Sequence, residues 1–150
     1  MTTRWDLVVR DRNDRPVVAI EVDATANTSP QWAAQFRRNL SKYGDLPDLP
    51  YLLMVFPDRL YLWKNNDHAP GIVEPTYIVD ARPFFQPYFD RAGVTVEQIS
   101  GDSLELILAS WLTTVMLRRP EELNGAEKWL IQSGLYDVLT GGKIEYEVVA

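Results

Sequence analysis

The first 23 residues combine two apolar strand patterns with carboxylate side chains. Val and Ile are frequent in residues 5–10 and 17–23, and the polar residues 11–16 between them are typical of a turn. This pattern predicts a β-hairpin. Asp6 lies in the first strand and Glu21 in the second, each between apolar neighbours. A strand that keeps a carboxylate within an apolar run needs a partner for it, such as a metal ion, a proton or a cationic group.

The register of this hairpin decides whether the carboxylates meet. A turn centred on Asn13 and Asp14 places Asp6 opposite Glu21, and directly opposed residues have Cβ atoms about 4.5–5.5 Å apart. Alternation puts Asp23 on the same face as Glu21, whereas a shift of one residue would move Asp6 to the other face. The expected register thus gathers three carboxylates and turns the apolar side chains to the core, namely Leu7, Val9, Val18, Ile20 and Val22.

Three close carboxylates favour a cation. Their mutual repulsion raises the pKa of at least one of them unless a positive charge compensates. Magnesium takes oxygen ligands and keeps several waters, and a bound metal can polarise a phosphoryl oxygen and lower the pKa of a water. We therefore expect a Mg²⁺ or Mn²⁺ site at Asp6, Glu21 and Asp23. A plainer interpretation stays open, in which Asp6 and Asp23 only begin and end strands.

The remaining chain alternates helix and strand patterns. Helices are predicted over 29–43, 102–119 and 121–133, and strands over 51–56, 59–63, 76–80 and 143–148, with an irregular segment at 81–93. The predicted fold class is α/β (α+β), with a mixed central sheet and flanking helices. We expect a single domain over 1–150, with a core at about 4–80 and a C-terminal helical extension and terminal strand at about 94–150.

Composition excludes several kinds of site. The chain has no cysteine and one histidine, His68, which excludes thiolate metal sites, disulfides and sites of several imidazoles. No apolar run reaches the roughly 18–20 residues of a membrane span, so we expect no membrane association and a cytoplasmic location. The net charge of −6 argues against strong non-specific binding to nucleic acid. A local basic surface stays open.

The order of Asp6, then Glu21-Val22-Asp23, then an amphipathic helix and another apolar strand, resembles the PD-(D/E)xK nuclease superfamily. The resemblance covers about residues 4–63 and implies a restriction-endonuclease-like fold. It further implies a magnesium-dependent endonuclease, a hydrolase acting on phosphodiester bonds of DNA or another nucleic acid. Asp6 and Glu21 would be the metal ligands, and the carbonyl of Val22 a further ligand.

The sequence departs from that family in two places. Asp23 stands where the family has a lysine that orients the attacking water and stabilises developing charge, and aspartate supplies no positive charge. A few relatives carry an acidic residue or glutamine there and still cleave. Family members often have a helix before the first motif strand, frequently with a glutamate facing the site. Only four residues precede Trp5, so we expect that element to be missing or supplied by a partner.

The predicted helix after the hairpin offers polar groups that could assist the site. Gln31, Gln35, Arg38 and Lys42 share one face, opposite an apolar stripe of Trp32, Phe36, Leu40 and Tyr43. In many superfamily members a polar residue of this helix reaches the site. Gln35 and Arg38 are therefore the candidates, and Lys42 lies nearly three turns in. A solvated face is the plainer interpretation of each residue.

Two functions remain open on the sequence. One is an endonuclease with an atypical site, and the other is a non-catalytic binding or oligomerisation module on the same fold. The missing lysine, the acidic charge and the unassigned segment 81–150 favour the second. A homodimer is a corresponding expectation, with Arg118 at a helix end and the terminal strand as its contacts.

Overall fold

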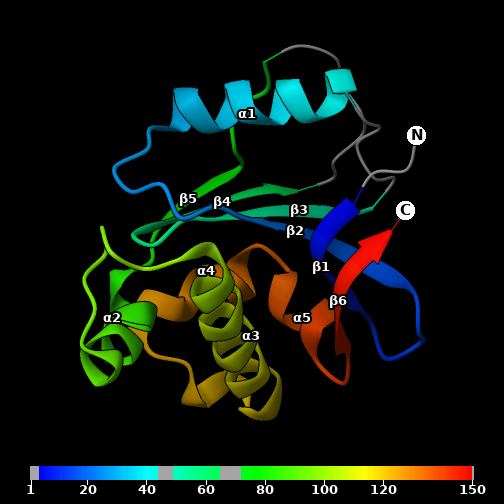
Figure 1. Cartoon of the computed structure of the whole chain (residues 1–150). Coiled ribbons are helices and arrows are strands. Elements are labelled where there is room, and N and C mark those ends of the chain that lie inside the picture. The colour runs from blue at the N-terminus through cyan, green and yellow to red at the C-terminus, as the bar shows by residue number, and fades with distance from the viewer. Residues whose placement is uncertain (1–3, 44–48, 65–71, 150) are drawn as a thin grey trace.

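A six-stranded mixed sheet organises the chain, with one helix on its first face and four helices on the other (Figure 1). The structure, a computed structural model, describes residues 4–43, 49–64 and 72–149. The strands are β1 Arg4–Arg10, β2 Pro16–Val22, β3 Tyr51–Val55, β4 Arg59–Lys64, β5 Tyr77–Asp80 and β6 Lys143–Val149. The helices are α1 Pro30–Tyr43, α2 Arg82–Ala92, α3 Gly101–Leu117, α4 Lys128–Gln132 and α5 Leu135–Leu139. The predicted mixed sheet with flanking helices is confirmed.

The strand order is β5-β4-β3-β2-β1-β6, and β2 and β3 run parallel while the other neighbours run antiparallel. Helix α1 provides the crossover that a parallel pair requires. Its start is capped as expected, because the Ser29 hydroxyl accepts a 3.0 Å hydrogen bond from the backbone N–H of Trp32. The C-terminal strand β6 returns to pair with β1 and forms the edge of the sheet, which confirms the predicted terminal strand.

The hairpin has the predicted register. Leu7 pairs with Ile20 and Val9 with Val18, so the same register places Asp6 opposite Glu21. The pairing shifts between Val9 and Arg10, where the ladder becomes irregular next to the turn. The irregularity lies at the far end of the hairpin from the two carboxylates, and the strand ends that carry them stay in register.

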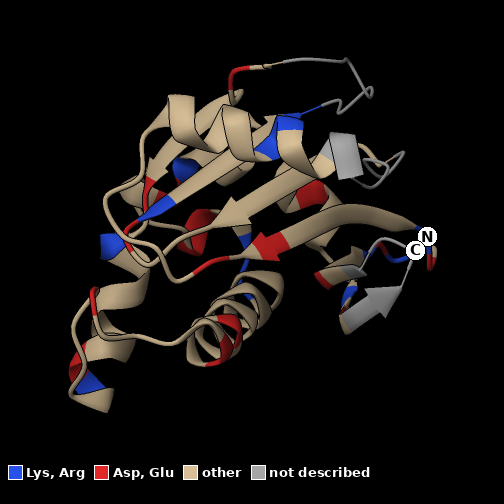
Figure 2. Ribbon diagram, turned by 45° about the horizontal axis from the view of Figure 1, so that its top comes forward, with Lys and Arg blue, Asp and Glu red and all other residues tan. Residues whose placement is uncertain are grey.

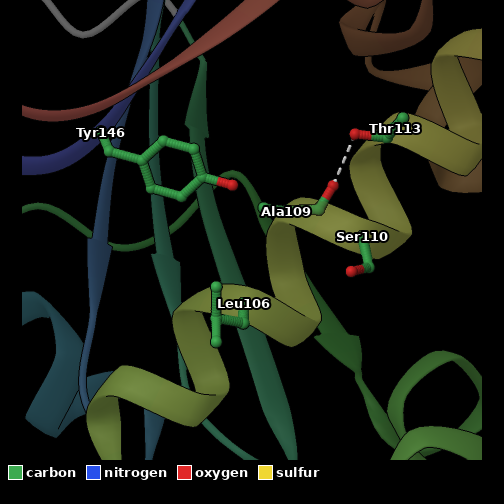
Figure 3. A pocket seen from close by; sticks show the side chains of 5 residues that line it. All are labelled: Leu106, Ala109, Ser110, Thr113 and Tyr146. Atoms are coloured by element: carbon green, nitrogen blue, oxygen red, sulfur yellow. Dashed lines mark hydrogen bonds between the residues drawn. The ribbon is translucent and has the colours of Figure 1, made fainter.

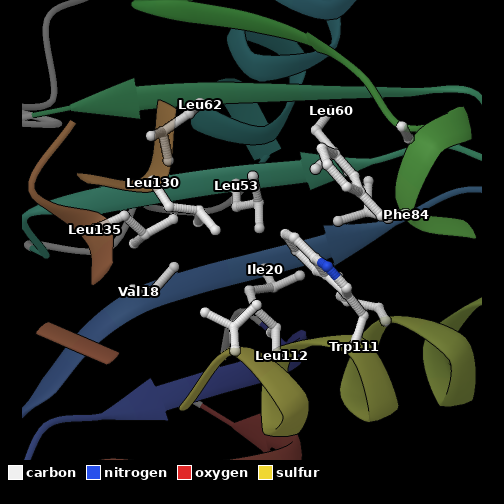
Figure 4. Packing of buried hydrophobic residues seen from close by; sticks show 14 of the residues in the cluster. Val18, Ile20, Leu53, Leu60, Leu62, Phe84, Trp111, Leu112, Leu130 and Leu135 are labelled. Atoms are coloured by element: carbon white, nitrogen blue, oxygen red, sulfur yellow. The ribbon is translucent and has the colours of Figure 1, made fainter. Parts of the chain in front are cut away.

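The sheet is covered on both faces, which explains the uninterrupted apolar run of β3. Every residue of β3 is buried. Toward α2–α5, the sheet contributes one core whose residues include Val18, Ile20, Leu53, Leu60 and Leu62 (Figure 4). Toward α1, a smaller core contains Val8, Ala19, Leu52, Met54 and Ala33. Full burial of one such large side chain stabilises the fold by about 1.5–3 kcal/mol, so β3 anchors both layers.

Segment 81–93, predicted to be irregular, forms helix α2. Pro83 lies in its first turn, where the missing N–H costs nothing, and Gly93 ends the helix with φ 68°. Pro87 lies inside the helix, but the buried rings of Phe85 and Phe89 hold the turn against the core. The prediction failed because tertiary burial outweighs the local preference of proline.

The helix predicted over 121–133 is confirmed only over its last part, Lys128–Gln132. Two 3₁₀ turns, Pro120–Glu122 and Gly125–Glu127, precede the short helix α4, and Gly134 with φ 81° separates α4 from α5. Glu127 causes the break, because its buried carboxylate pairs with Arg118 and receives hydrogen bonds from Trp111 and from the backbone of Asn124. Helix α3 is confirmed, and its N-terminus is capped by Ser100, whose hydroxyl accepts a hydrogen bond from the backbone N–H of Ser103.

Candidate functional site

Asp6 and Glu21 meet at the end of the hairpin. The Oδ2 atom of Asp6 accepts a 2.7 Å hydrogen bond from the backbone N–H of Val22, the residue after Glu21. Both carboxylates are partly buried. The bond to Val22 fixes the Asp6 carboxylate against the last residue of β2. A hydrogen bond to a charged acceptor is stronger than one to a neutral acceptor.

The carboxyl group of Glu21 is strongly perturbed. Its pKa is raised to about 8, first by burial and then by the negative charges of Asp6, Asp23 and Glu105, in that order of importance. Both causes disfavour the charged form. Glu21 therefore holds a proton at neutral pH, and a cation that binds beside it displaces that proton.

Glu105 is the last in importance of the three charges that raise the pKa of Glu21, and the sequence did not point to it. It is partly buried on α3, which packs against β2. Neighbouring residues of a helix point to different faces, so its place between Leu104 and Leu106 gave no signal like that of Glu21 on its strand. Only the packing of α3 on the sheet brings the charge of Glu105 within range of Glu21.

Asp23 lies one residue beyond the strand that was predicted to contain it. Strand β2 ends at Val22, although the backbone N–H of Asp23 still donates a 3.0 Å hydrogen bond to the carbonyl of Val55 on β3. The Asp23 Oδ1 atom accepts a 2.8 Å hydrogen bond from the backbone N–H of Thr25. One carboxylate oxygen of Asp23 thus stabilises the turn after β2, while the charge of Asp23 still raises the pKa of Glu21.

Within the described ranges, no three Asp, Glu, His or Cys side chains lie close enough together to hold a metal ion. A smaller ligand set fits the hairpin. Magnesium keeps several waters, so the two carboxylates of Asp6 and Glu21 with the carbonyl of Val22 provide the kind of oxygen donors that it takes. The hydrogen bond between Asp6 and Val22 holds two of these three residues together.

Helix α1 presents its side chains differently from the predicted faces. Its deepest residues are Ala33, Ala34 and Arg37, whose side chain is 1% exposed, while Trp32 is 39% exposed. Gln35 donates a 3.3 Å hydrogen bond to Asn39 on the same helix, and Arg38 is exposed. The charges that raise the pKa of Glu21 are all carboxylates. The assisting roles of Gln35 and Arg38 stay predictions.

Two further sequence candidates fall elsewhere. The side chain of Lys42 and all of His68 lie outside the described residues. Over the described ribbon, acidic and basic residues are interspersed (Figure 2). A nucleic acid would therefore meet local groups around the hairpin instead of a broad basic face.

Comparisons with known proteins add no identification. No family model, curated protein or solved structure matches the chain. No helix among the described residues has the length and apolar character needed to cross a membrane.

Proposed function

We propose that the chain is a nuclease-like domain of the PD-(D/E)xK type, which binds a divalent cation at Asp6 and Glu21 and hydrolyses phosphodiester bonds in DNA or another nucleic acid. The observation that carries the proposal is the hairpin itself. Asp6 stands opposite Glu21 and is bound to the N–H of Val22, and β2 continues through α1 into the parallel strand β3. This is the arrangement that the sequence resemblance implies for a restriction-endonuclease-like core.

The C-terminal part of the chain completes the surroundings of the hairpin. The charge of Glu105 on α3 adds to those that raise the pKa of Glu21, and β6 pairs with β1 on the side away from β2.

A bound magnesium or manganese ion would polarise a phosphoryl oxygen and lower the pKa of a water molecule. The protein's own groups have separate tasks around it. Asp6, oriented by Val22, supplies a fixed carboxylate, while Glu21 releases its proton to become a ligand. Asp23 and Glu105 add negative charge that favours the cation. Neither residue replaces the positive charge of the family's lysine.

The same cluster also favours the second function, a non-catalytic binding module. Three acidic groups raise the pKa of Glu21, the lysine position holds Asp23, and one oxygen of Asp23 is bound to the backbone of Thr25. A site without a cationic group stabilises a phosphoryl transition state less well. On this alternative the fold binds a partner and cleaves nothing.

The two functions are separated by assays of purified protein on single-stranded and double-stranded DNA and RNA with Mg²⁺ or Mn²⁺. The nuclease proposal expects cleavage that Glu21→Gln and Asp6→Asn abolish, because each removes a ligand charge. Glu97→Gln, an exposed acid remote in sequence from the hairpin, is the matched control and keeps full activity. Cleavage that survives Glu21→Gln contradicts the site. If the wild type neither cleaves nor binds metal, the result favours the non-catalytic binding module.

A further inference from the structure

Strand β6 leaves one side of the sheet open. It pairs with β1 on its inner side and is the last strand in the described order. The N–H and C=O groups on the outer side of such a strand are a template for another chain, and proteins usually protect it with charges or proline. β6 has no proline. Two of its charged residues pair within the chain, Lys143 with Asp14 at 3.0 Å and Glu145 with Arg10.

A shallow groove of mixed polar and apolar lining runs beside this open edge, between β6 and α3. Its wall on α3 includes Leu106, Thr113 and Leu117, and its wall on β6 includes Ile144 and Tyr146. Leu106, Leu117 and Tyr146 are 63%, 81% and 52% exposed. Large apolar side chains gathered at one edge mark an interaction surface more often than scattered ones do.

The groove has room for a further side chain. Tyr146 extends from β6 toward α3 and faces the small residues Ala109 and Ser110 (Figure 3). The hydroxyl of Thr113 is turned back to its own helix, where it donates a 2.8 Å hydrogen bond to the carbonyl of Ala109. The middle of the groove is therefore lined by short side chains, and the larger Leu106 and Leu117 lie toward its ends.

We propose that two copies of this chain join edge to edge through β6, antiparallel across a twofold axis, so that their sheets become continuous. The sequence of β6 is self-complementary in one register, centred on Glu145. Ile144 then stands opposite Tyr146 of the second copy, on the face of the groove. This pair occurs twice, as a twofold interface requires.

The alternative register, centred on Tyr146, is less favourable. It places Glu145 opposite Glu147 of the second copy, twice, and like charges directly opposed destabilise a sheet. The preferred register opposes the two Glu145 side chains only once, and each of them is already paired with Arg10 of its own chain. The interface uses the outer side of β6 and the groove beside α3, and it involves neither of the proposed metal ligands, Asp6 and Glu21.

Light scattering of the eluting protein tests the interface. The wild type is expected to be a dimer and Tyr146→Lys a monomer, with circular dichroism showing that both are folded. Ile78→Lys is the matched control, because Ile78 is 50% exposed on β5, the opposite edge of the sheet, and this variant stays dimeric. A monomeric wild type, or a dimer that resists Tyr146→Lys, overturns the proposal.

Cysteine variants test the register, since the chain has no cysteine of its own. A disulfide requires Cα atoms about 4.4–6.8 Å apart. Under mild oxidation Glu145→Cys is expected to form a disulfide-linked dimer, and so is a mixture of Ile144→Cys with Tyr146→Cys. Ile78→Cys stays unlinked. The mixture leaves the ion pair between Glu145 and Arg10 intact, so its cross-linking is independent of that pair. The register is contradicted if Tyr146→Cys cross-links by itself while neither Glu145→Cys nor the mixture does.

Discussion

The Oδ2 atom of Asp6 lies 2.7 Å from the backbone nitrogen of Val22 and accepts its hydrogen bond. This bond joins the two strands of the hairpin at the end that carries the acidic residues. Val22 is the last residue of β2, and its N–H donates to a side-chain oxygen of β1. Asp6 therefore shapes the hairpin in addition to contributing a negative charge beside Glu21.

Asp6→Ala is expected to destabilise the protein. The substitution leaves the partly buried N–H of Val22 without its acceptor, and an unsatisfied buried donor costs about 1–3 kcal/mol. Because Glu21 is protonated at neutral pH, removing the charge of Asp6 relieves no repulsion there, and the loss of the hydrogen bond decides the sign. Urea unfolding measures the change. Glu97→Ala, at an exposed position, serves as the control and stays within about 0.5 kcal/mol of the wild type.

Stability without added metal is expected to fall between pH 5 and pH 8. The pKa of Glu21 is raised from 4.5 to about 8, so in this range the folded state keeps a proton that the unfolded state has released. The stabilisation is fully present below pH 4.5 and is lost as the pH rises through about 8. The pKa values of Asp80 and Glu127 are lowered, so their contributions change only at lower pH.

Glu21→Gln removes this titration. Urea unfolding at several pH values is expected to show a nearly flat profile for the variant, against a decline of a few kcal/mol at most for the wild type, since one pKa unit corresponds to about 1.36 kcal/mol. Equal slopes in the two proteins would mean that Glu21 has an ordinary pKa.

Asp23→Lys is expected to create or increase metal-dependent cleavage. A lysine there supplies the positive charge that the family uses and removes one of the negative charges that raise the pKa of Glu21. Asp90→Lys, an equal charge change at an exposed position of α2, is the control and leaves activity unchanged. NMR titration of the Glu21 carboxyl carbon follows its pKa in parallel. A lower pKa with no cleavage would favour the binding module.

Two ion pairs that differ in burial are expected to differ in how much each contributes to the stability of the protein. Glu127 is 3% exposed and pairs with Arg118, and removing one partner of a buried pair costs about 3–5 kcal/mol. Glu127→Gln keeps the shape, and Arg118 is 25% exposed, so we expect a value near the lower limit. Asp80→Asn breaks the exposed pair with Arg82 and costs about 0–1 kcal/mol. Similar losses in both variants would contradict a structural role for Glu127.

The hairpin could be predicted from the sequence because its information is local. The polar turn and the alternation of Leu7, Val9, Val18 and Ile20 select one register, and any other would expose the apolar face. The end of β2 was misplaced by one residue, since its pairing with β3 depends on a strand far along the chain. Boundaries of this kind depend on tertiary contacts.

The remaining differences have the same origin. Nothing near Glu105 in the sequence states that α3 will meet β2, and nothing near Arg37 states that α1 will bury it while Trp32 stays partly exposed. The small side chains of Ala33 and Ala34 let α1 approach the sheet closely, which selects a face that an apolar stripe alone does not. Helix α2 formed despite two prolines because its phenylalanine rings are buried.

The central claim is that Asp6 and Glu21 hold a divalent cation. Its most direct test is an anomalous difference map from crystals soaked in Mn²⁺ above pH 8, where the Glu21 carboxyl is ionised. We predict a single strong peak at this hairpin, within bonding distance of both carboxylates and of the Val22 carbonyl, and no such peak in Glu21→Gln crystals. A wild-type map without density at this position would contradict the claim.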